Sequence, residues 1–413
     1  MDTGPDKVCS ARRSPAETGA RPRTSMASGV SFMITLLCVG SMLSTITWYM
    51  IDDKSAGVSH KPPPQKKSPS KPSALCKGCR KLIDDVLKRH SENWKKNEEN
   101  HRTFTSKLSS SCRGFDRAVV TQANTPVGTK IQYDGERGRI LQVTPAIFKT
   151  FVKEHPFSNR TFETCAVVGN GGILMDSGCG NMIDSAQFVI RCNLPPLNDE
   201  YGKHVGVRTD LVTANPSILK EKYESLMGRR RSFAERLQSY GKALILLPAF
   251  SYAFNTGLSM RAVYTLDDFG SPAHAVFFNP DYLRNLSRFW NSNGLKSHRL
   301  STGIMMASLA LEACSNVHLY GFWPFSNHPH GLYPLTNHYY DDRPVNAKFH
   351  AMPVEFDLLL KLHSQGVLRL HLGDCPADQN HVTHLHWGGH ITLKMFSTLK
   401  IIYYCASSIL SLE

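Results

Sequence analysis

Acidic residues are scarce in this chain, and its positive charge is unevenly spread. The 413 residues hold 34 Asp and Glu against 48 Lys and Arg, a formal net charge of +14. Residues 1–110 carry 19 basic and 10 acidic residues, or +9, which leaves +5 for the rest. The basic residues lack interleaved aromatic residues and any recognisable nucleic-acid-binding module. We therefore expect no nucleic-acid partner.

A dinucleotide fingerprint is also missing. The apolar run Cys165–Val168 is short enough to be a buried parallel strand, and Gly-Asn-Gly-Gly follows it at 169–172. Glycines there let the backbone turn tightly and approach a ligand beyond the carboxyl end of the strand. The fingerprint needs a further glycine at 174, which is Leu174, so a dehydrogenase is disfavoured. A plain strand-to-helix connection is the alternative.

A second cysteine pair is missing beside Cys76-Lys-Gly-Cys79, which could otherwise be half of a zinc site or a redox pair. We prefer a disulfide in a stem, within one chain or between the two chains of a homodimer. The preceding residues 54–73 are rich in Pro, Ser and Lys, which is typical of an extended spacer. Residues 82–108 have a helix-forming composition with only a partial apolar stripe.

Residues 30–51 carry no charge, and their length suits one crossing of a bilayer, with Trp48 and Tyr49 in the place of an interfacial anchor. We expect a transmembrane helix. The alternative, a cleaved signal peptide, is disfavoured because the apolar stretch is long for one and lacks a convincing small-residue cleavage site. Arginines before this segment and Asp52 and Asp53 after it predict a cytosolic tail, 1–29, and a luminal remainder.

Nine of the 11 cysteines lie beyond the apolar segment. Together with two glycosylation sequons, Asn159-Arg-Thr and Asn285-Leu-Ser, they favour an oxidising secretory compartment over the cytosol. Proline spoils a third sequon at Asn215.

From about residue 131, apolar strand candidates alternate with helical stretches, which predicts a doubly wound α/β sheet with helices on both faces. The strand candidates are Cys165–Gly169, Phe188–Arg191, Leu211–Ala214, Ala243–Leu247, Ala275–Phe278, Val317–Gly321 and Val367–Leu372. The helical stretches are Ile218–Leu226, Tyr282–Trp290, Gly303–Glu312 and Val354–His363.

Residues 165–217 resemble the large sialyl motif of the animal sialyltransferases, which use the nucleotide sugar CMP-sialic acid. Further blocks follow in that family's order: Arg-Leu-Ser-Thr-Gly through Tyr-Gly-Phe-Trp at 299–323, His-Tyr-Tyr-Asp at 338–341, and His350 with Glu355 five residues later. The resemblance covers roughly residues 152–375. Arg-Cys-Asn at 191–193 and Arg-Leu-Ser-Thr-Gly-Ile point to the alpha-2,8 branch, nearest its type VI and then its type V members.

The resemblance implies a Rossmann-like sheet, the sialyltransferase variant of the GT-A type, in a catalytic domain at 131–375 after a luminal stem at 52–130. It assigns contacts with CMP-sialic acid or the acceptor to Asn170, Asn193, Ser301, Thr302, Gly303, Trp323 and His338. The resemblance also implies two disulfides, Cys165–Cys314 and Cys179–Cys375. We take these pairs from the family, because sequence alone cannot fix the connectivity.

His350 is the favoured general base by this resemblance, since imidazole titrates near neutral pH and can take a proton from an acceptor hydroxyl. His338 would face the leaving phosphate. Without the family pattern, both histidines could be packing or surface residues. Ser301 precedes a helical run, where its hydroxyl caps the helix and the free N–H groups also suit an anion. Glu355 either orients a helix or ligand or acts as a cap.

No Asp-x-Asp motif occurs, the motif through which many nucleotide-sugar transferases bind a metal. CMP is a monophosphate, so basic and helix-terminal groups can replace the ion as it leaves. We expect no metal and no cofactor besides the donor substrate. Asp268-Phe269-Gly270 resembles a kinase fragment, but the other kinase motifs are missing, and we treat it as chance.

The segment 376–413 departs from the family and is expected to be an atypical C-terminal tail. Its four histidines lack a settled metal-ligand spacing, so we prefer a segment that packs loosely on the domain. They are His381, His384, His386 and His390.

Taken together, these features predict a single-pass type II protein of the Golgi apparatus membrane that forms alpha-2,8 linkages with inversion. The expected acceptors are sialylated glycoproteins, with O-glycans favoured, or gangliosides. The resemblance also disfavours a polymerising enzyme. The polysialylating members of that family carry a denser basic segment before the Ser-Thr-Gly block, whereas here Arg284, Arg288, Lys296 and Arg299 are interrupted by Asp281 and many neutral residues. The alternative is a non-catalytic sialoglycan-binding protein on the same fold, which would release no free CMP.

Overall fold

The computed structural model describes residues 43–44, 79–90, 93–136, 138–157, 161–198, 200–296, 299–342 and 352–375. The chain divides into two units, residues 1–70 and 71–413, and every element named below belongs to the second. Apart from residues 43–44, the predicted transmembrane segment 30–51 lies outside the described residues, as do the spacer 54–73 and the tail 376–413. Within the described ranges, no helix has both the length and the apolar character that a membrane crossing requires.

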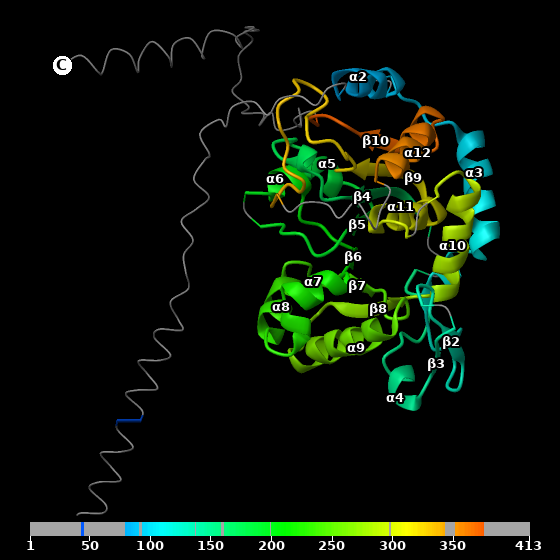
Figure 1. Ribbon diagram of the computed structural model, residues 1–413, viewed down its shortest axis with the longest axis vertical. Coiled ribbons are helices and arrows are strands. Elements are labelled where there is room, and N and C mark those ends of the chain that lie inside the picture. Colours follow the sequence, from blue (N-terminus) through cyan, green and yellow to red (C-terminus); the bar gives the residue numbers. More distant parts are fainter. Residues whose placement is uncertain are drawn as a thin grey trace, which may run out of the picture. The chain divides into compact units, whose positions relative to one another are not determined.

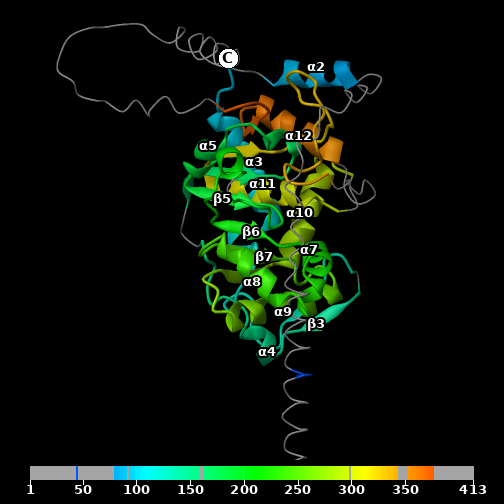
Figure 2. The same ribbon diagram turned by 90° about the vertical axis from the view of Figure 1, so that its left-hand side faces the viewer.

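An eight-stranded sheet forms the centre of the unit, and all seven predicted strands are confirmed in it (Figure 1). Every neighbouring pair is parallel except the short edge pair β1–β8. Figure 2 shows β5, β6 and β7 following one another along the unit. In spatial order the strands are β1 (Val119–Val120), β8 (His274–Phe278), β7 (Leu244–Leu247), β6 (Leu211–Thr213), β5 (Phe188–Arg191), β4 (Phe162–Val168), β9 (Cys314–Tyr320) and β10 (Arg369–His371).

The strand order reverses at β4. Strands β5 to β8 follow it in sequence toward one edge, whereas β9 returns to pair with β4 on its other side. Val168, the last residue of β4, lies opposite Arg191 of β5 and Tyr320 of β9, so the three strands end level with one another. In open α/β sheets the crevice at such a switch point is where ligands bind.

Helices cover both faces of the sheet, because successive residues of a strand point to opposite sides. In β4, Cys165 and Val167 belong to one buried cluster, and Ala166 and Val168 belong to another. The first cluster is completed by α2 (Cys79–Arg89), α3 (Glu98–Cys112), α10 (Pro280–Ser292), α11 (Thr302–Ala313) and α12 (Met352–Ser364). The second is completed by α4 (Pro145–Phe148), α5 (Gly180–Asp184), α6 (Gly202–Val205), α7 (Pro216–Glu221), α8 (Arg230–Gln238) and α9 (Ala253–Asp268).

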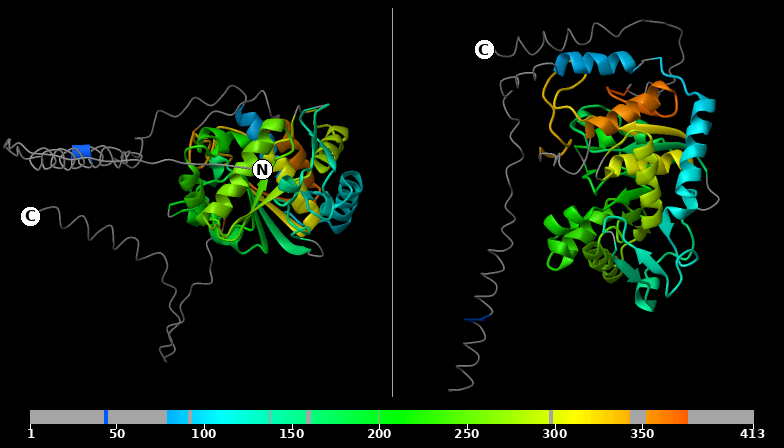
Figure 3. Two further views of the ribbon diagram at one scale, coloured as in Figure 1. Left: turned by 90° about the horizontal axis from the view of Figure 1, so that it is seen from below. Right: turned by 45° about the vertical axis from the view of Figure 1, so that its right-hand side comes forward.

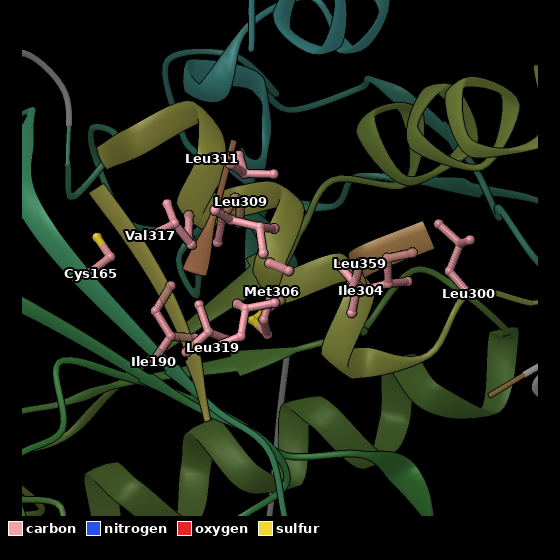
Figure 4. Close-up of a cluster of buried hydrophobic side chains, with 14 of the residues drawn as sticks. Cys165, Ile190, Leu300, Ile304, Met306, Leu309, Leu311, Val317, Leu319 and Leu359 are labelled. Carbon is pink, nitrogen blue, oxygen red and sulfur yellow. The ribbon is translucent and has the colours of Figure 1, made fainter. Parts of the chain in front are cut away.

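Helix α11 is the centre of the first cluster. Figure 4 shows Leu309 and Met306 beside the strand residues Val317 and Leu319, and Ile304 beside Leu359 of α12. These side chains are at most 2 % exposed. Because α11 is apolar on nearly all sides, burial holds it firmly against the sheet and fixes the position of its first residues.

The folded unit begins earlier than the boundary expected at residue 131. Ile83 of α2, Leu108 of α3 and Val119 of β1 are all part of the first buried cluster. Helix α3 runs beside α10, as Figures 1 and 3 both show. The predicted stem, 52–130, therefore includes residues that pack in the core. A partial apolar stripe was enough for burial because α3 packs against α10 and α11, and α2 packs against α12.

Three short 3₁₀ turns and a hairpin complete the described structure. The last turn lies at the end of the predicted helical stretch Ile218–Leu226, whereas the hairpin and the other two turns were not predicted. The hairpin joins β2 (Lys130–Gln132) to β3 (Ile140–Gln142), and the turns are Phe115–Arg117, Gly172–Leu174 and Glu224–Leu226. Elements of three residues are too short to show a periodic pattern.

Both predicted disulfides form. Cys165 in β4 pairs with Cys314 in β9, with their Cα atoms 6.0 Å apart, and Cys179 pairs with Cys375 at 4.9 Å. The first links the two strands of the switch point, and the second joins the segment before α5 to the one after β10. Of the other described cysteines, Cys112 and Cys192 are buried free thiols.

Candidate active site

The glycine turn after β4 packs tightly against neighbouring backbone. A Cβ atom on Gly169 or Gly171 would lie 2.8 or 2.6 Å from the carbonyl oxygen of Gly321, and one on Gly172 would collide with that of Thr336. We expected these glycines to let the backbone approach a ligand. They instead allow the turns after β4 and β9 to approach each other, which brings the segment around Thr336 to the switch point.

Asn170 sits in this turn with its amide held in place. Its Nδ2 group donates to the carbonyl of Cys192 over 2.8 Å, and its own carbonyl accepts from the N–H of Tyr339 over 2.9 Å. Its Oδ1 atom is buried and has no hydrogen-bond partner among the described residues. A fixed acceptor of this kind is available to a bound ligand, because a buried polar atom without a partner is costly.

His338 is brought to the same turn from 168 positions further along the chain. It forms an antiparallel bridge with Gly171, and its Nδ1 atom lies 2.7 Å from Oδ1 of Asp341. The imidazole stacks on Tyr340 at a centroid distance of 5.2 Å. These contacts fix the orientation of the ring and place it, half-buried, beside Asn170.

A second group of polar side chains lies at the ends of β5 and β6. Asn193 has φ of 65°, a left-handed conformation that Asn adopts more readily than most residues. Its Oδ1 atom accepts from the N–H of Asn215 over 3.0 Å, and the side chain of Asn215 donates to the hydroxyl of Thr302 over 3.2 Å. Asn215 therefore connects two predicted site residues. Its place at the end of β6 was the sequence signal that could have identified it.

The N-terminus of α11 is capped within the protein. The Oγ atom of Ser301 accepts from the N–H of Ile304 over 3.2 Å, and Glu355 accepts from both the hydroxyl and the N–H of Ser301, the latter over 2.9 Å. Ser301 and Glu355 are 6 % and 2 % exposed. The side chain of Ser301 is thus occupied, whereas Thr302 and Gly303 present the first N–H groups of the helix, which suit an anion.

Arg191, the last residue of β5, holds the strand end that carries Asn193. It is fully buried, and its guanidinium donates to the carbonyls of Val205, over 2.7 Å, and of Arg208, over 2.8 Å. Burial lowers its pKa, and Asp184 lies 3.6 Å away. Arg191 therefore ties the end of β5, and with it Asn193, to the segment before β6.

Trp323 lies in the core, in the chain that follows β9. Its indole is 7 % exposed, packs against Phe325 and Phe356, and donates its N–H to the carbonyl of Asn327 over 2.8 Å. The expected contact of Trp323 with the ligand stays a prediction, and such a contact would use the ring because the indole N–H is already hydrogen-bonded within the protein. Its role in the described structure is to hold the chain after β9.

A cavity of about 500 Å³ opens at the carboxyl ends of β6, β7 and β8. Of the predicted site residues, Thr302 alone lines it, and Asn215, which is hydrogen-bonded to Thr302, lines it as well. The remaining lining residues are Thr213, Pro216, Ser217, Leu246, Pro248, Tyr252, Phe254, Asn255, Phe278, Leu283, Arg299, Leu300 and Met305.

Two of the predicted site residues lie outside the part of the chain that the structure describes. The proposed base His350 and the sequon residue Asn159 lie outside the described residues. Asn285 is half-buried on α10, and its Oδ1 atom accepts from Arg288 over 3.0 Å. No cluster of three or more metal-binding side chains is found in the described part of the chain.

The family model described as glycosyltransferase family 29 (sialyltransferase) matches residues 119–367. A human protein named alpha-2,8-sialyltransferase 8E is 48% identical over 282 residues, which are 68% of this chain and 75% of that protein. The human alpha-2,8-sialyltransferase 8F is 44% identical over 68% of this chain and 71% of its own length. A Xenopus tropicalis alpha-N-acetylneuraminide alpha-2,8-sialyltransferase is 42% identical over 73% of this chain and 86% of its own length.

Proposed function

The chain belongs to glycosyltransferase family 29, the sialyltransferases, and on that premise we propose that it transfers sialic acid from CMP-sialic acid to a terminal sialic acid of a glycoprotein or glycolipid. The linkage formed is alpha-2,8, as the names of relatives at 42% to 48% identity indicate for those proteins. The observation that carries the proposal is the convergence of Asn170, Asn193, Thr302 and His338 at the switch point of the sheet.

The donor is held by two kinds of group in this proposal. The side chains of Asn170 and Asn193 offer amide groups to the nucleotide, and the N–H groups of Thr302 and Gly303 face its phosphate. The support for the phosphate contact is the position of helix α11. This helix is 12 residues long, and the hydrogen bond between Ser301 and Glu355 holds its N-terminus in place. His338 faces the leaving phosphate, with its ring oriented by Asp341.

In the transfer step, a hydroxyl oxygen of the acceptor attacks the anomeric carbon of the donor sialic acid. The bond from that carbon to the CMP phosphate oxygen breaks, the configuration inverts, and the hydroxyl proton passes to a base, for which we propose His350. CMP leaves with its electron pair on phosphate. Positive groups at the helix terminus stabilise that charge, so we propose that no metal is needed.

Location and assembly are further parts of the proposal. Two disulfides support folding in an oxidising compartment, and the uncharged segment 30–51 supports a type II anchor in the Golgi membrane. O-glycans of glycoproteins are the favoured acceptors, with gangliosides as the other class. A disulfide at Cys76 or Cys79 would provide the link in a homodimer.

The test is to incubate the full-length protein in detergent with CMP-sialic acid and a panel of sialylated O-glycans, N-glycans and gangliosides. We expect release of free CMP together with a product that a linkage-specific sialidase identifies as alpha-2,8. A protein that binds sialylated glycans but releases no CMP with any acceptor would contradict the proposal and support a non-catalytic binding role.

A further inference from the structure

The cavity beside α11 contains a positively charged aromatic cluster that the donor contacts leave unused. The guanidinium carbon of Arg299 lies 5.1 Å from the centroid of the Tyr252 ring. Tyr252 in turn stacks on Phe254, with ring centroids 6.0 Å apart and planes inclined by 25°. All three line the cavity together with Thr302, which is three residues after Arg299. We call Tyr252, Phe254 and Arg299 the Arg299 cluster.

Phe254 is unusually exposed for a large apolar side chain in a cavity wall, at 64%. Burial in the core would account for neither its position nor its stacking on Tyr252. The faces of two stacked aromatic rings suit the C–H face of a sugar ring, and an arginine beside them suits a carboxylate, to which its planar fork binds in a bidentate manner.

The Arg299 cluster is built on a rigid support. The N–H of Gly135 donates to the carbonyl of Ser251 over 2.9 Å, and the N–H of Ala253 donates to Glu136 over 2.9 Å. A Cβ atom on Gly135 would lie 2.5 Å from the Tyr252 ring, so the connection between β2 and β3 packs directly against this tyrosine. The ring is therefore positioned before any ligand arrives, which lowers the entropic cost of binding.

Asn255 supplies an independent sign of a ligand. It lines the cavity at 1% exposure and donates from Nδ2 to the carbonyl of Pro248 over 3.1 Å. Its Oδ1 atom is buried without a hydrogen-bond partner among the described residues. Such an atom is costly in a folded protein, and an N–H or hydroxyl group of a ligand would satisfy it.

We propose that the Arg299 cluster is the subsite for the terminal sialic acid of the acceptor, with Arg299 pairing with its carboxylate and the two aromatic rings carrying its sugar ring. This inference rests on the proposed function, in which the acceptor is itself a sialic acid. The hydroxyl that attacks belongs to the same sugar as the carboxylate. Holding that carboxylate at Arg299, near Thr302, would bring the hydroxyl toward the donor at the N-terminus of α11.

The donor sialic acid also carries a carboxylate, so the cluster has two candidate ligands of the same chemistry. We favour the acceptor because only Thr302 among the proposed donor groups lines this cavity, whereas Asn170, Asn193 and His338 do not. Asp134 lies within electrostatic reach of both Arg299 and Arg284. Burial raises the pKa of Asp134, whereas Arg299 and Arg284 act to lower it.

The experiment uses the full-length protein and two acceptors: a sialylated trisaccharide and the same compound with its carboxylate converted to a methyl amide. The wild type should use the carboxylate acceptor at least about tenfold better in kcat/KM. Arg299→Gln should lower kcat/KM for that acceptor by about 10- to 100-fold and leave the amide acceptor nearly unchanged, so that discrimination disappears. Phe254→Ala, at an exposed side chain, should weaken both acceptors equally.

Arg288→Gln is the matched control. It also removes one arginine charge, but from α10, where Arg288 contacts Asn285 and does not line the cavity. It should behave as the wild type. Thermal denaturation of each variant confirms folding, and Arg299→Lys, which retains the charge, should restore part of the discrimination if Arg299→Gln folds poorly.

Three outcomes bear on the inference. If Arg299→Gln still discriminates between the two acceptors, the inference is wrong. If that variant also has a raised KM for CMP-sialic acid, Arg299 belongs to the donor site. Calorimetry of the two acceptors in the presence of CMP tests the subsite by binding alone, and so distinguishes a failure of the subsite from a failure of the proposed enzymatic function. A wild type that makes no alpha-2,8 product but binds the carboxylate acceptor in an Arg299-dependent manner would retain the subsite and reject the enzyme.

Discussion

Glu355 of α12 accepts the backbone N–H of Ser301 over 2.9 Å, across 54 positions of sequence. Both residues are buried, and the carboxylate also accepts the serine hydroxyl. One end of α12 therefore fixes the first turn of α11. The resemblance assigned Ser301 to the donor, and Glu355 was expected to orient a helix or ligand or to act as a cap. In the structure the two residues together hold the start of α11, whose N–H groups are the proposed phosphate contacts.

Removing this contact should affect both stability and donor binding. Glu355→Ala leaves the N–H of Ser301 buried without an acceptor, at a cost of about 1 to 3 kcal/mol, and loosens the start of α11. We expect a lower free energy of unfolding in urea and weaker CMP binding by calorimetry. Glu355→Gln, which retains an acceptor, should lose less, and Glu235→Ala at an exposed position of α8 should change neither. Normal CMP affinity in Glu355→Ala would show that α11 needs no such support.

Loss of His350 should act on chemistry more than on donor binding. A positioned base contributes about 10²- to 10⁴-fold, because the acceptor hydroxyl is a weak nucleophile near neutral pH. His350→Ala should lower kcat by a factor in that range, leave CMP affinity nearly unchanged and abolish the acidic limb of the pH–rate profile. His338→Ala should weaken donor binding as well. A folded His350→Ala with near-normal kcat would end this assignment and make His338 the next candidate.

Turnover should survive chelation. The proposed phosphate site consists of N–H groups at α11 and contains no carboxylate pair, so EDTA should leave initial rates within experimental error of the control. The measurement is CMP release at saturating donor, before and after dialysis against EDTA. Loss of activity that manganese restores would show that the phosphate is held by an ion and that the helix terminus is insufficient.

The two disulfides should contribute separately to stability. Cys179→Ser with Cys375→Ser removes a link between residues 196 positions apart. The expected loss is roughly 2 to 5 kcal/mol in the free energy of unfolding, measured by urea denaturation. Cys112→Ser, at a buried free thiol, is the control for introducing a hydroxyl into the core. Peptide mapping of the active protein should recover Cys179 joined to Cys375, and an unpaired Cys179 would refute the pairing.

Acid should destabilise the packing of the N-terminal helices through His363. Its Nδ1 atom accepts from the N–H of Leu370 over 3.1 Å, and its ring stacks on His90 at 4.5 Å. Burial, and then the charge of His90, lower the pKa of His363 to about 4 from a usual value of 6.5. The unfolded chain therefore binds the proton first, and stability that is present above pH 6.5 is lost as the pH falls toward 4.

Between pH 7 and pH 5 this single histidine should cost about 1 to 2 kcal/mol. His363→Gln, which retains an acceptor for Leu370, should show a smaller dependence of unfolding free energy on pH. His274→Gln at an exposed site is the control. Glu312 works in the opposite direction, since burial raises its pKa to about 7 and its destabilising charge is lost in acid. Equal pH dependence in wild type and His363→Gln would contradict the assignment.

The sequence predicted the sheet well because its strands are short, apolar and buried on both faces. Such an apolar run can be identified from the sequence alone, without information on tertiary contacts. It did not predict α9, a helix of 16 residues, because Asn255, Thr256 and Thr265 are buried polar residues that interrupt the apolar stripe. The resemblance located Asn170 and Asn193 by motif alone. Arg299 and Tyr252 could not be connected in advance, since their contact depends on how two loops after different strands come together.

The packing of α2, α3 and β1 on the core sets a limit on how far the domain can travel from a membrane. If residues 30–51 form the anchor, as the sequence predicts, at most residues 52–78 can serve as a tether, because residues from α2 onward pack in the folded unit. A fully extended chain spans at most about 3.3 to 3.6 Å per residue, so this tether reaches roughly 90 Å, about a third of the reach of the longer segment. Glycans of tall glycoproteins that hold their termini beyond that height would escape the enzyme, whereas those close to the lipid surface would remain within its range.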